Sequence, residues 1–124
     1  MTLRISAEQM TRYKQTALKR WRQEQAEREQ RREQARQLAH KAAALLKKEF
    51  NVTRVLLFGS LVHSGRFTRW SDVDLAAWGL TSSNWLRAMA AVRDLSNEIE
   101  LNLVDVSCCS PTLLAAIERE GVPL

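Results

Sequence analysis

Residues 57–78 read LFGSLVHSGRFTRWSDVDLAAW and hold two polar motifs between two apolar runs. Gly59 and Ser60 follow the first run, and two aspartates one residue apart, Asp72 and Asp74, precede the second. Both runs are rich in Val, Leu and Ala, which is typical of buried strands. The pattern therefore predicts two strands that present a Gly-Ser turn and a pair of carboxylates to each other.

The aspartate pair predicts a site for a divalent cation. Residues two apart in a strand share a face, so Asp72 and Asp74 are expected to point the same way, about 6.6 Å apart. Carboxylates this close repel each other unless a cation lies between them, and Mg²⁺ prefers one or two carboxylates with phosphate oxygens and water. Backbone N–H groups beside Gly59, with the Ser60 hydroxyl, form a nest for phosphate. Either motif alone is common in loops, but together they indicate nucleotidyl transfer, in which a metal stabilises the leaving pyrophosphate.

The rest of the sequence predicts helices around a small sheet. Ser6 and Gln9 match a capping box, and no Gly or Pro follows before residue 50, so one helix is expected over most of residues 7–49. The other expected elements are strands 52–58, 72–78 and 98–106 and helices 82–96 and 111–120. This order predicts an α/β fold of the α+β kind, a small mixed β-sheet with flanking helices, plus a long N-terminal helix.

The long helix is expected to extend beyond the body of the protein, because 43 residues at about 1.5 Å each span about 65 Å. Its first part carries a narrow apolar stripe that includes Tyr13 and Trp21, its middle is charged all round, and a wider apolar face returns at residue 38. Residues 1–37 are therefore expected to be a basic helical arm, continuous with the first helix of a domain over residues 38–124. The length favours contact of the arm with a second chain over a merely solvated helix.

Charge is distributed unevenly along the chain. Residues 1–51 contain 13 Lys and Arg against 6 Asp and Glu, whereas residues 52–124 contain 6 against 8. A nucleic-acid-binding module is therefore an alternative function, in which the arginines of the arm would contact phosphates. Glutamates interrupt this basic patch, so direct nucleic-acid binding is not expected. The arginines are Arg28, Arg31, Arg32 and Arg36, and the glutamates are Glu24, Glu27, Glu29 and Glu33.

A cytoplasmic protein outside the membrane is expected, because no run approaches about 18 consecutive apolar residues and residues 1–6 lack a signal-peptide pattern. The adjacent Cys108 and Cys109 are expected to be reduced thiols. Neighbouring cysteines rarely form a relaxed disulfide, and no histidine lies near them to complete a metal site.

The sequence resembles the minimal nucleotidyltransferases of the polymerase-beta superfamily over roughly residues 38–124. The signature of that family is Gly-Ser, a connector with a glycine, and then Ser-Asp-x-Asp-Leu. Here it reads Gly59-Ser60, Gly65 and Ser71-Asp72-Val73-Asp74-Leu75, with a connector of 11 residues between Ser60 and Asp72. The resemblance implies a nucleotidyltransferase fold in which ATP is the substrate and Mg²⁺ the cofactor. It further implies that Gly59, Ser60 and Ser71 bind the nucleotide and that Asp72 and Asp74 are catalytic metal ligands.

One departure from the family pattern concerns the third catalytic carboxylate. The family carries it on the third strand, where this chain has Asn102; Asp105 is expected to face away by strand alternation. An amide ligates metals weakly and cannot accept a proton from an attacking hydroxyl. Glu100, on the same face, is a possible substitute. Because a positioned base contributes about 10²- to 10⁴-fold, catalysis is expected to be slow rather than absent.

The resemblance also implies a partner. Minimal members of this family are typically paired with a small helical HEPN protein, an RNase toxin, and act as its antitoxin by transferring AMP from ATP to a toxin tyrosine. A protein adenylyltransferase of a toxin–antitoxin pair is therefore the first expectation. An antitoxin that acts by binding alone, with its chemistry lost at Asn102, is the alternative. A small-molecule acceptor is disfavoured, because the chain has no room for an acceptor domain.

Overall fold

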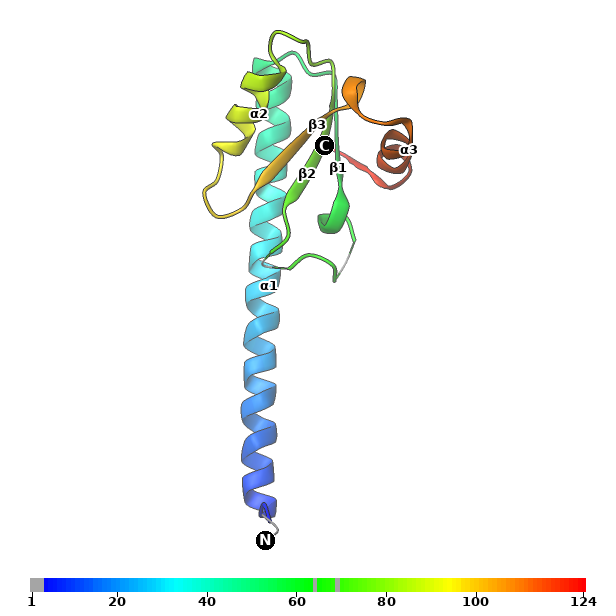
Figure 1. Cartoon of the computed structure of the whole chain (residues 1–124). Helices are drawn as coiled ribbons and strands as arrows, with labels where there is room; N and C mark the ends of the chain where they lie inside the picture. The colour runs from blue at the N-terminus through cyan, green and yellow to red at the C-terminus, as the bar shows by residue number, and fades with distance from the viewer. Residues whose placement is uncertain (1–3, 64, 69) are drawn as a thin grey trace.

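The computed structural model describes residues 4–63, 65–68 and 70–124 as one long helix with a small sheet packed on its C-terminal part (Figure 1). The helices are α1 (Ala7–Glu49), α2 (Trp85–Arg93) and α3 (Pro111–Glu120), with two short 3₁₀ turns, η1 (Gly59–Leu61) and η2 (Val106–Cys108). The strands are β1 (Arg54–Phe58), β2 (Val73–Trp78), β3 (Leu101–Asp105) and β4 (Val122–Pro123).

The sheet is mixed, with the strand order β3-β2-β1-β4. β1 pairs with β2 and with β4 in antiparallel fashion, and β2 pairs with β3 in parallel. The predicted fold class, a small mixed sheet with flanking helices and a long N-terminal helix, is confirmed. The sequence did not predict β4, because two residues are too few to show the alternation of a strand.

The predicted N-terminal cap of the longest helix, α1, is confirmed. The Ser6 hydroxyl accepts a hydrogen bond from the Gln9 backbone N–H at 3.1 Å, and the Gln9 side chain accepts from the Ser6 backbone at 3.0 Å. This reciprocal pair satisfies two N–H groups that have no partner within the helix. The Ser110 hydroxyl caps α3 in the same way, by accepting from Leu113 N–H at 3.2 Å.

The predicted elements 82–96 and 98–106 are both too long at their facing ends. The Ser96 hydroxyl accepts hydrogen bonds from the backbone N–H groups of Glu98 and Ile99, at 3.2 and 3.1 Å. This side-chain turn competes with helix and strand alike for the local backbone, so α2 ends at Arg93 and β3 begins only at Leu101. Strands 52–58 and 72–78 likewise begin slightly later than predicted, at Arg54 and Val73.

The C-terminal part of α1 packs on the sheet through small side chains. Four alanines there are at most 3 % exposed, and Leu46 is fully buried among them. Small residues let the helix lie close to the sheet, where a core apolar cluster from β1, β2, β3 and α2 meets it. The four alanines are Ala35, Ala39, Ala42 and Ala43.

This close packing predicts a large cost for added volume. Ala39→Leu inserts three carbon atoms into a filled layer, so we expect the free energy of unfolding to fall by about 1–3 kcal/mol. Ala44→Leu, at an exposed position of the same helix, is the matched control and should change stability by less than about 0.5 kcal/mol. Urea denaturation followed by circular dichroism measures both, and equal stability of the two variants would contradict the packing described.

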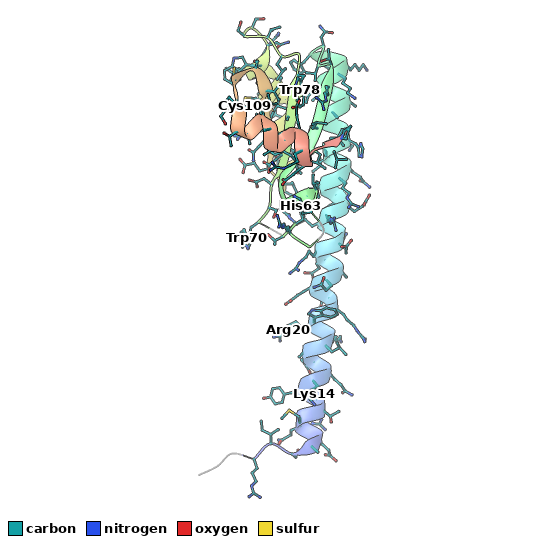
Figure 2. The ribbon with its side chains drawn as sticks, turned by 90° about the vertical axis from the view of Figure 1, so that its right-hand side faces the viewer. Lys14, Arg20, His63, Trp70, Trp78 and Cys109 are labelled. Atoms are coloured by element: carbon teal, nitrogen blue, oxygen red, sulfur yellow. The ribbon has the colours of Figure 1, made fainter. Side chains whose placement is uncertain are left out.

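The N-terminal part of α1 projects beyond the sheet (Figure 1). Its apolar side chains are uncovered: Met10 is 44 % exposed, Tyr13 68 % and Trp21 57 %. Figure 2 shows Lys14 and Arg20 on this projecting part, beyond His63 and Trp70 at the near end of the body. Within the described residues, no helix is both long and apolar enough to cross a membrane.

Candidate active site

The site lies at the end of the sheet from which α1 projects, where β1 ends and β2 begins (Figure 1). Phe58, the last residue of β1, pairs with Asp74 of β2, so the Gly59–Ser60 turn follows directly beside the aspartates. Gly59 has a φ of +81°, and a Cβ at this position would collide with the Asp74 carboxylate. Only glycine therefore allows the turn to approach the carboxylate this closely.

The aspartates meet Asn102 across the parallel pair of β2 and β3. Asp74 and Asn102 are direct partners in the strand register. The Asn102 side-chain amide donates to Asp72 Oδ2 at 3.3 Å and to Asp74 Oδ1 at 3.4 Å. The three residues thus share one face of the sheet. Asn102, at the position where the family carries its third carboxylate, lies beside the carboxylates of Asp72 and Asp74.

The electrostatics of this cluster favour a bound cation. Burial raises the pKa of the Asp74 carboxyl above its ordinary value, and the neighbouring charges of Asp72 and Glu100 raise this pKa further, against the hydrogen bond from Asn102. Partly desolvated oxygens on two adjacent carboxylates are the ligand set that Mg²⁺ prefers. The residues present therefore fit a magnesium ion held by Asp72 and Asp74.

The two serines of the signature have different surroundings. Within the part of the chain that the structure describes, no hydrogen bond engages the Ser60 hydroxyl, which lies in the turn after β1. The Ser71 hydroxyl instead accepts from Thr68 N–H at 3.0 Å and lies 3.3 Å from Thr68 Oγ1. Ser71 therefore fixes the connector that leads into β2, and the role predicted for it in nucleotide binding stays a prediction.

Helix α2 adds an arginine beside the third strand that the sequence did not indicate. Arg93, in the last turn of α2, donates to Asn102 Oδ1 at 3.3 Å and pairs with Glu100 at 3.4 Å. Glu100, the possible substitute ligand, is thus engaged by Arg93. Among the described residues, no three of His, Cys, Asp and Glu are grouped as a metal site. No motif marks Arg93, because its contacts depend on how α2 packs against β3.

Asp105 lies away from this cluster, as predicted from strand alternation. Its carboxylate accepts hydrogen bonds from the Ser107 backbone N–H at 3.1 Å and from the Ser107 hydroxyl at 2.8 Å. Asp105 therefore caps η2, the short turn that follows β3. Cys108 and Cys109 in and after this turn are free thiols.

Comparison with known proteins defines the family. The model of the polymerase beta nucleotidyltransferase family matches residues 40–124, and the chain belongs to this family. Two crystal structures of mutants of the toxin–antitoxin MntA-HpeT share the fold, each with a TM-score of 0.56. One is 22 % identical over 68 % of this chain and 69 % of that chain; the other is 19 % identical over 68 % and 70 %. No curated protein matches the chain.

The raised pKa of Asp74 predicts how stability depends on pH. A carboxyl with a raised pKa binds its proton more tightly in the folded state, so its ionisation destabilises the fold. This cost is absent below the pKa of an unfolded aspartate, about 3.9, and is complete above the raised pKa of folded Asp74. Asp74→Asn removes the titration, and we expect it to unfold at a higher temperature than the wild type at pH 7, with the difference declining toward pH 4.

Thermal unfolding between pH 4 and pH 8, without divalent cations, measures this effect. Adding MgCl₂ at pH 7 should raise the unfolding temperature of the wild type but not that of Asp74→Asn, because only the wild type retains both ligands. A wild type that is more stable than the variant at pH 7 without Mg²⁺ would contradict the electrostatic account.

Proposed function

We propose that the chain is an antitoxin-type nucleotidyltransferase that neutralises a partner toxin of the HEPN RNase class by Mg²⁺-dependent transfer of AMP from ATP to a toxin tyrosine. The observation that carries this proposal is the sheet edge at which Asp72 and Asp74 adjoin the Gly59–Ser60 turn within a nucleotidyltransferase domain. The shared fold with the toxin–antitoxin MntA-HpeT supports the partner class.

Each group of the site has a definite task in this reaction. The Gly59 turn and the Ser60 hydroxyl hold the triphosphate, and Asp72 and Asp74 hold Mg²⁺. With Mg²⁺ bound, the charge that develops as pyrophosphate leaves is stabilised. The tyrosine hydroxyl attacks the α-phosphorus, its new P–O bond replaces the bond to pyrophosphate, and its proton passes to solvent water. The Asn102 amide cannot take that proton, so this chain supplies no base at the third position.

The arm, residues 1–37, is the proposed docking element for the partner. It lies outside residues 40–124, the family domain, and the N-terminal part of α1 within it projects from the end of the body that carries the aspartates (Figure 1). Residues 4–22 carry six basic residues and one acidic residue beside exposed Tyr13 and Trp21, so an acidic helical face is the complementary partner surface. A partner on the arm would face the nucleotide site.

A groove of about 520 Å³ lies where the arm meets the connector before β2. Arg28 and Arg31 line it from α1, and Thr68 and Trp70 line it from the connector. Because Thr68 bonds directly to Ser71, next to the aspartates, this groove adjoins the site. It offers a place for a partner side chain that approaches along the arm.

A second candidate function is neutralisation by binding alone. The specific observation is the Asn102 amide, which directs N–H groups at both Asp72 and Asp74, where the family carries a carboxylate. A chain of this kind would hold the same partner through the same arm but transfer nucleotide slowly or not at all.

Co-expression with a partner toxin of the HEPN RNase class separates the two functions. The wild-type chain should relieve the growth arrest that the partner causes. A variant with both Asp72→Asn and Asp74→Asn should lose this relief while still co-purifying with the partner. Full relief by that variant would favour binding alone, and failure of the wild type to relieve arrest would reject both functions.

The arm is expected to contribute strongly to partner affinity. Trp21→Ala removes a large exposed aromatic side chain, and such side chains commonly cost 2 kcal/mol or more when truncated at interfaces, which is roughly 30-fold in Kd. Gln23→Ala, on the opposite face of the same helix, is the control and should change Kd less than about twofold. Isothermal titration measures both, and equal affinities would place the partner elsewhere.

A further inference from the structure

A continuous line of polar contacts joins Arg93 to the aspartate pair through Asn102. Arg93 Nη2 donates to Asn102 Oδ1 at 3.3 Å. At its other end the Asn102 amide donates to Asp72 Oδ2 and Asp74 Oδ1, at 3.3 and 3.4 Å. The amide is therefore held at both ends, with its nitrogen toward the carboxylates and its oxygen toward the guanidinium.

This orientation opposes a cation between the aspartates. The Asn102 N–H groups direct their positive ends at the oxygens that would ligate the ion, and an amide ligates a metal only through its oxygen. For Asn102 to become a ligand, its amide must turn over about the Cβ–Cγ bond. Its NH₂ group would then face Arg93, which has donors only, and the hydrogen bond between the two side chains would be lost.

We infer that Arg93 is a positioning residue that keeps the oxygen of Asn102 turned away from the metal and so weakens cation binding at Asp72 and Asp74. Glu100 holds Arg93 in place through its ion pair at 3.4 Å. The inference rests on the proposed use of the two aspartates as metal ligands. It deepens that proposal, because it names what makes the third position of this chain weak.

The effect depends on asparagine at position 102. A carboxylate there has an oxygen at each end, so it can accept from Arg93 and still present an oxygen to the metal. The same arginine would then support the metal site. With an amide, the end nearer to Arg93 must be the oxygen, and the donor end is left for the aspartates. Arg93 therefore opposes metal binding only because Asn102 stands between them.

Arg93 also carries a positive charge near the site, and this charge alone would weaken cation binding. A double-mutant cycle separates the two effects. Arg93→Met removes both the donor and the charge, whereas Asn102→Ala removes the amide on which the donor acts. In the Asn102→Ala background, Arg93→Met reports the loss of the charge and the release of Glu100 without the contribution of the amide.

The experiment is a titration of the full chain with MnCl₂, in which electron paramagnetic resonance measures free Mn²⁺. Arg93→Met should tighten Mn²⁺ binding roughly three- to tenfold in the wild-type background, as expected for releasing one exposed hydrogen bond of ordinary strength. In the Asn102→Ala background the same change should tighten binding by less than about twofold. Equal tightening in both backgrounds, or none in the wild type, would overturn the inference.

A second variant and a second measurement test the same inference if Arg93→Met does not fold well. If Arg93→Met is poorly folded by circular dichroism, Arg93→Gln serves instead, because a glutamine amide can accept from or donate to either end of Asn102; it should also tighten binding. The Asn102 side-chain NH₂ resonances should move on addition of Mg²⁺ in the Arg93 variants more than in the wild type, and no such difference would count against the inference. The titration contains neither nucleotide nor partner, so its outcome is independent of whether AMP transfer occurs.

Discussion

Asn102→Asp is expected to raise the rate of AMP transfer to the partner by about 10²-fold. The substitution supplies a third carboxylate beside Asp72 and Asp74, in direct register with Asp74. A carboxylate can accept the proton of the attacking hydroxyl and can ligate Mg²⁺, and an amide does neither well. The new carboxylate also accepts a hydrogen bond from Arg93, and it has no N–H groups to direct at the metal. Transfer from α-labelled ATP under single-turnover conditions measures the gain.

Asn102→Ala is the control for this prediction. It removes the amide but adds no base, so transfer should stay within roughly tenfold of the wild-type rate and far below that of Asn102→Asp. Without Mg²⁺, Asn102→Asp should unfold at a lower temperature than the wild type, because three carboxylates then repel one another. An unchanged transfer rate in Asn102→Asp would show that position 102 does not limit the reaction.

Gly59→Ala is expected to abolish transfer and to destabilise the fold. The φ of +81° at Gly59 costs an alanine about 1–2 kcal/mol, and the new Cβ meets the Asp74 carboxylate. Either the turn or the carboxylate must move, and both belong to the proposed phosphate and metal sites. We expect at least a 10²-fold loss of transfer, since misplacement by about 1 Å costs that much.

Gly65 provides the matched control for the collision. It has nearly the same φ, +82°, but a Cβ there would meet no atom within 4 Å. Gly65→Ala therefore carries the backbone strain without the contact to Asp74. We expect a similar loss of unfolding free energy from strain and little loss of transfer. Equal losses of activity in the two variants would show that the approach of Gly59 to Asp74 does not matter for the reaction.

The sequence predicted best where a local pattern determines the structure. The capping box at Ser6 and the absence of Gly and Pro predicted α1 and its N-terminal cap, because helix formation depends on near neighbours. Two glycine-bounded apolar runs predicted β1 and β2 and the pairing of the Gly59 turn with Asp74. Strand alternation placed Asn102 with the aspartates and turned Asp105 away.

The sequence did not predict features that depend on contacts between residues far apart in the chain or on side-chain hydrogen bonds in turns. β4 exists only because two residues after Gly121 pair with Leu56 and Leu57. α2 and β3 are shorter than their patterns suggest, because the Ser96 hydroxyl holds the turn between them. Arg93 is an ordinary arginine near the end of a helix until the packing of α2 on β3 brings it to Asn102.

The proposed docking arm and the candidate site are carried by different parts of the chain. The N-terminal part of α1 extends past the end of the sheet that carries the aspartates (Figure 1), and Met10, Tyr13 and Trp21 on it are exposed. In the proposed function, the arm binds the partner and the site transfers the nucleotide, so mutations can affect one of these activities without the other. Loss of Trp21 should weaken binding, whereas loss of Asp74 should stop transfer within an intact complex.

The most direct test of the nucleotide-transfer site is the intact mass of the co-purified partner after incubation with ATP and Mg²⁺. We predict that the partner gains the mass of AMP slowly with the wild-type chain, faster with Asn102→Asp, and not at all with Asp74→Asn. An unchanged partner mass with both the wild type and Asn102→Asp would contradict the assignment of Asp72, Asp74 and the Gly59–Ser60 turn to nucleotidyl transfer.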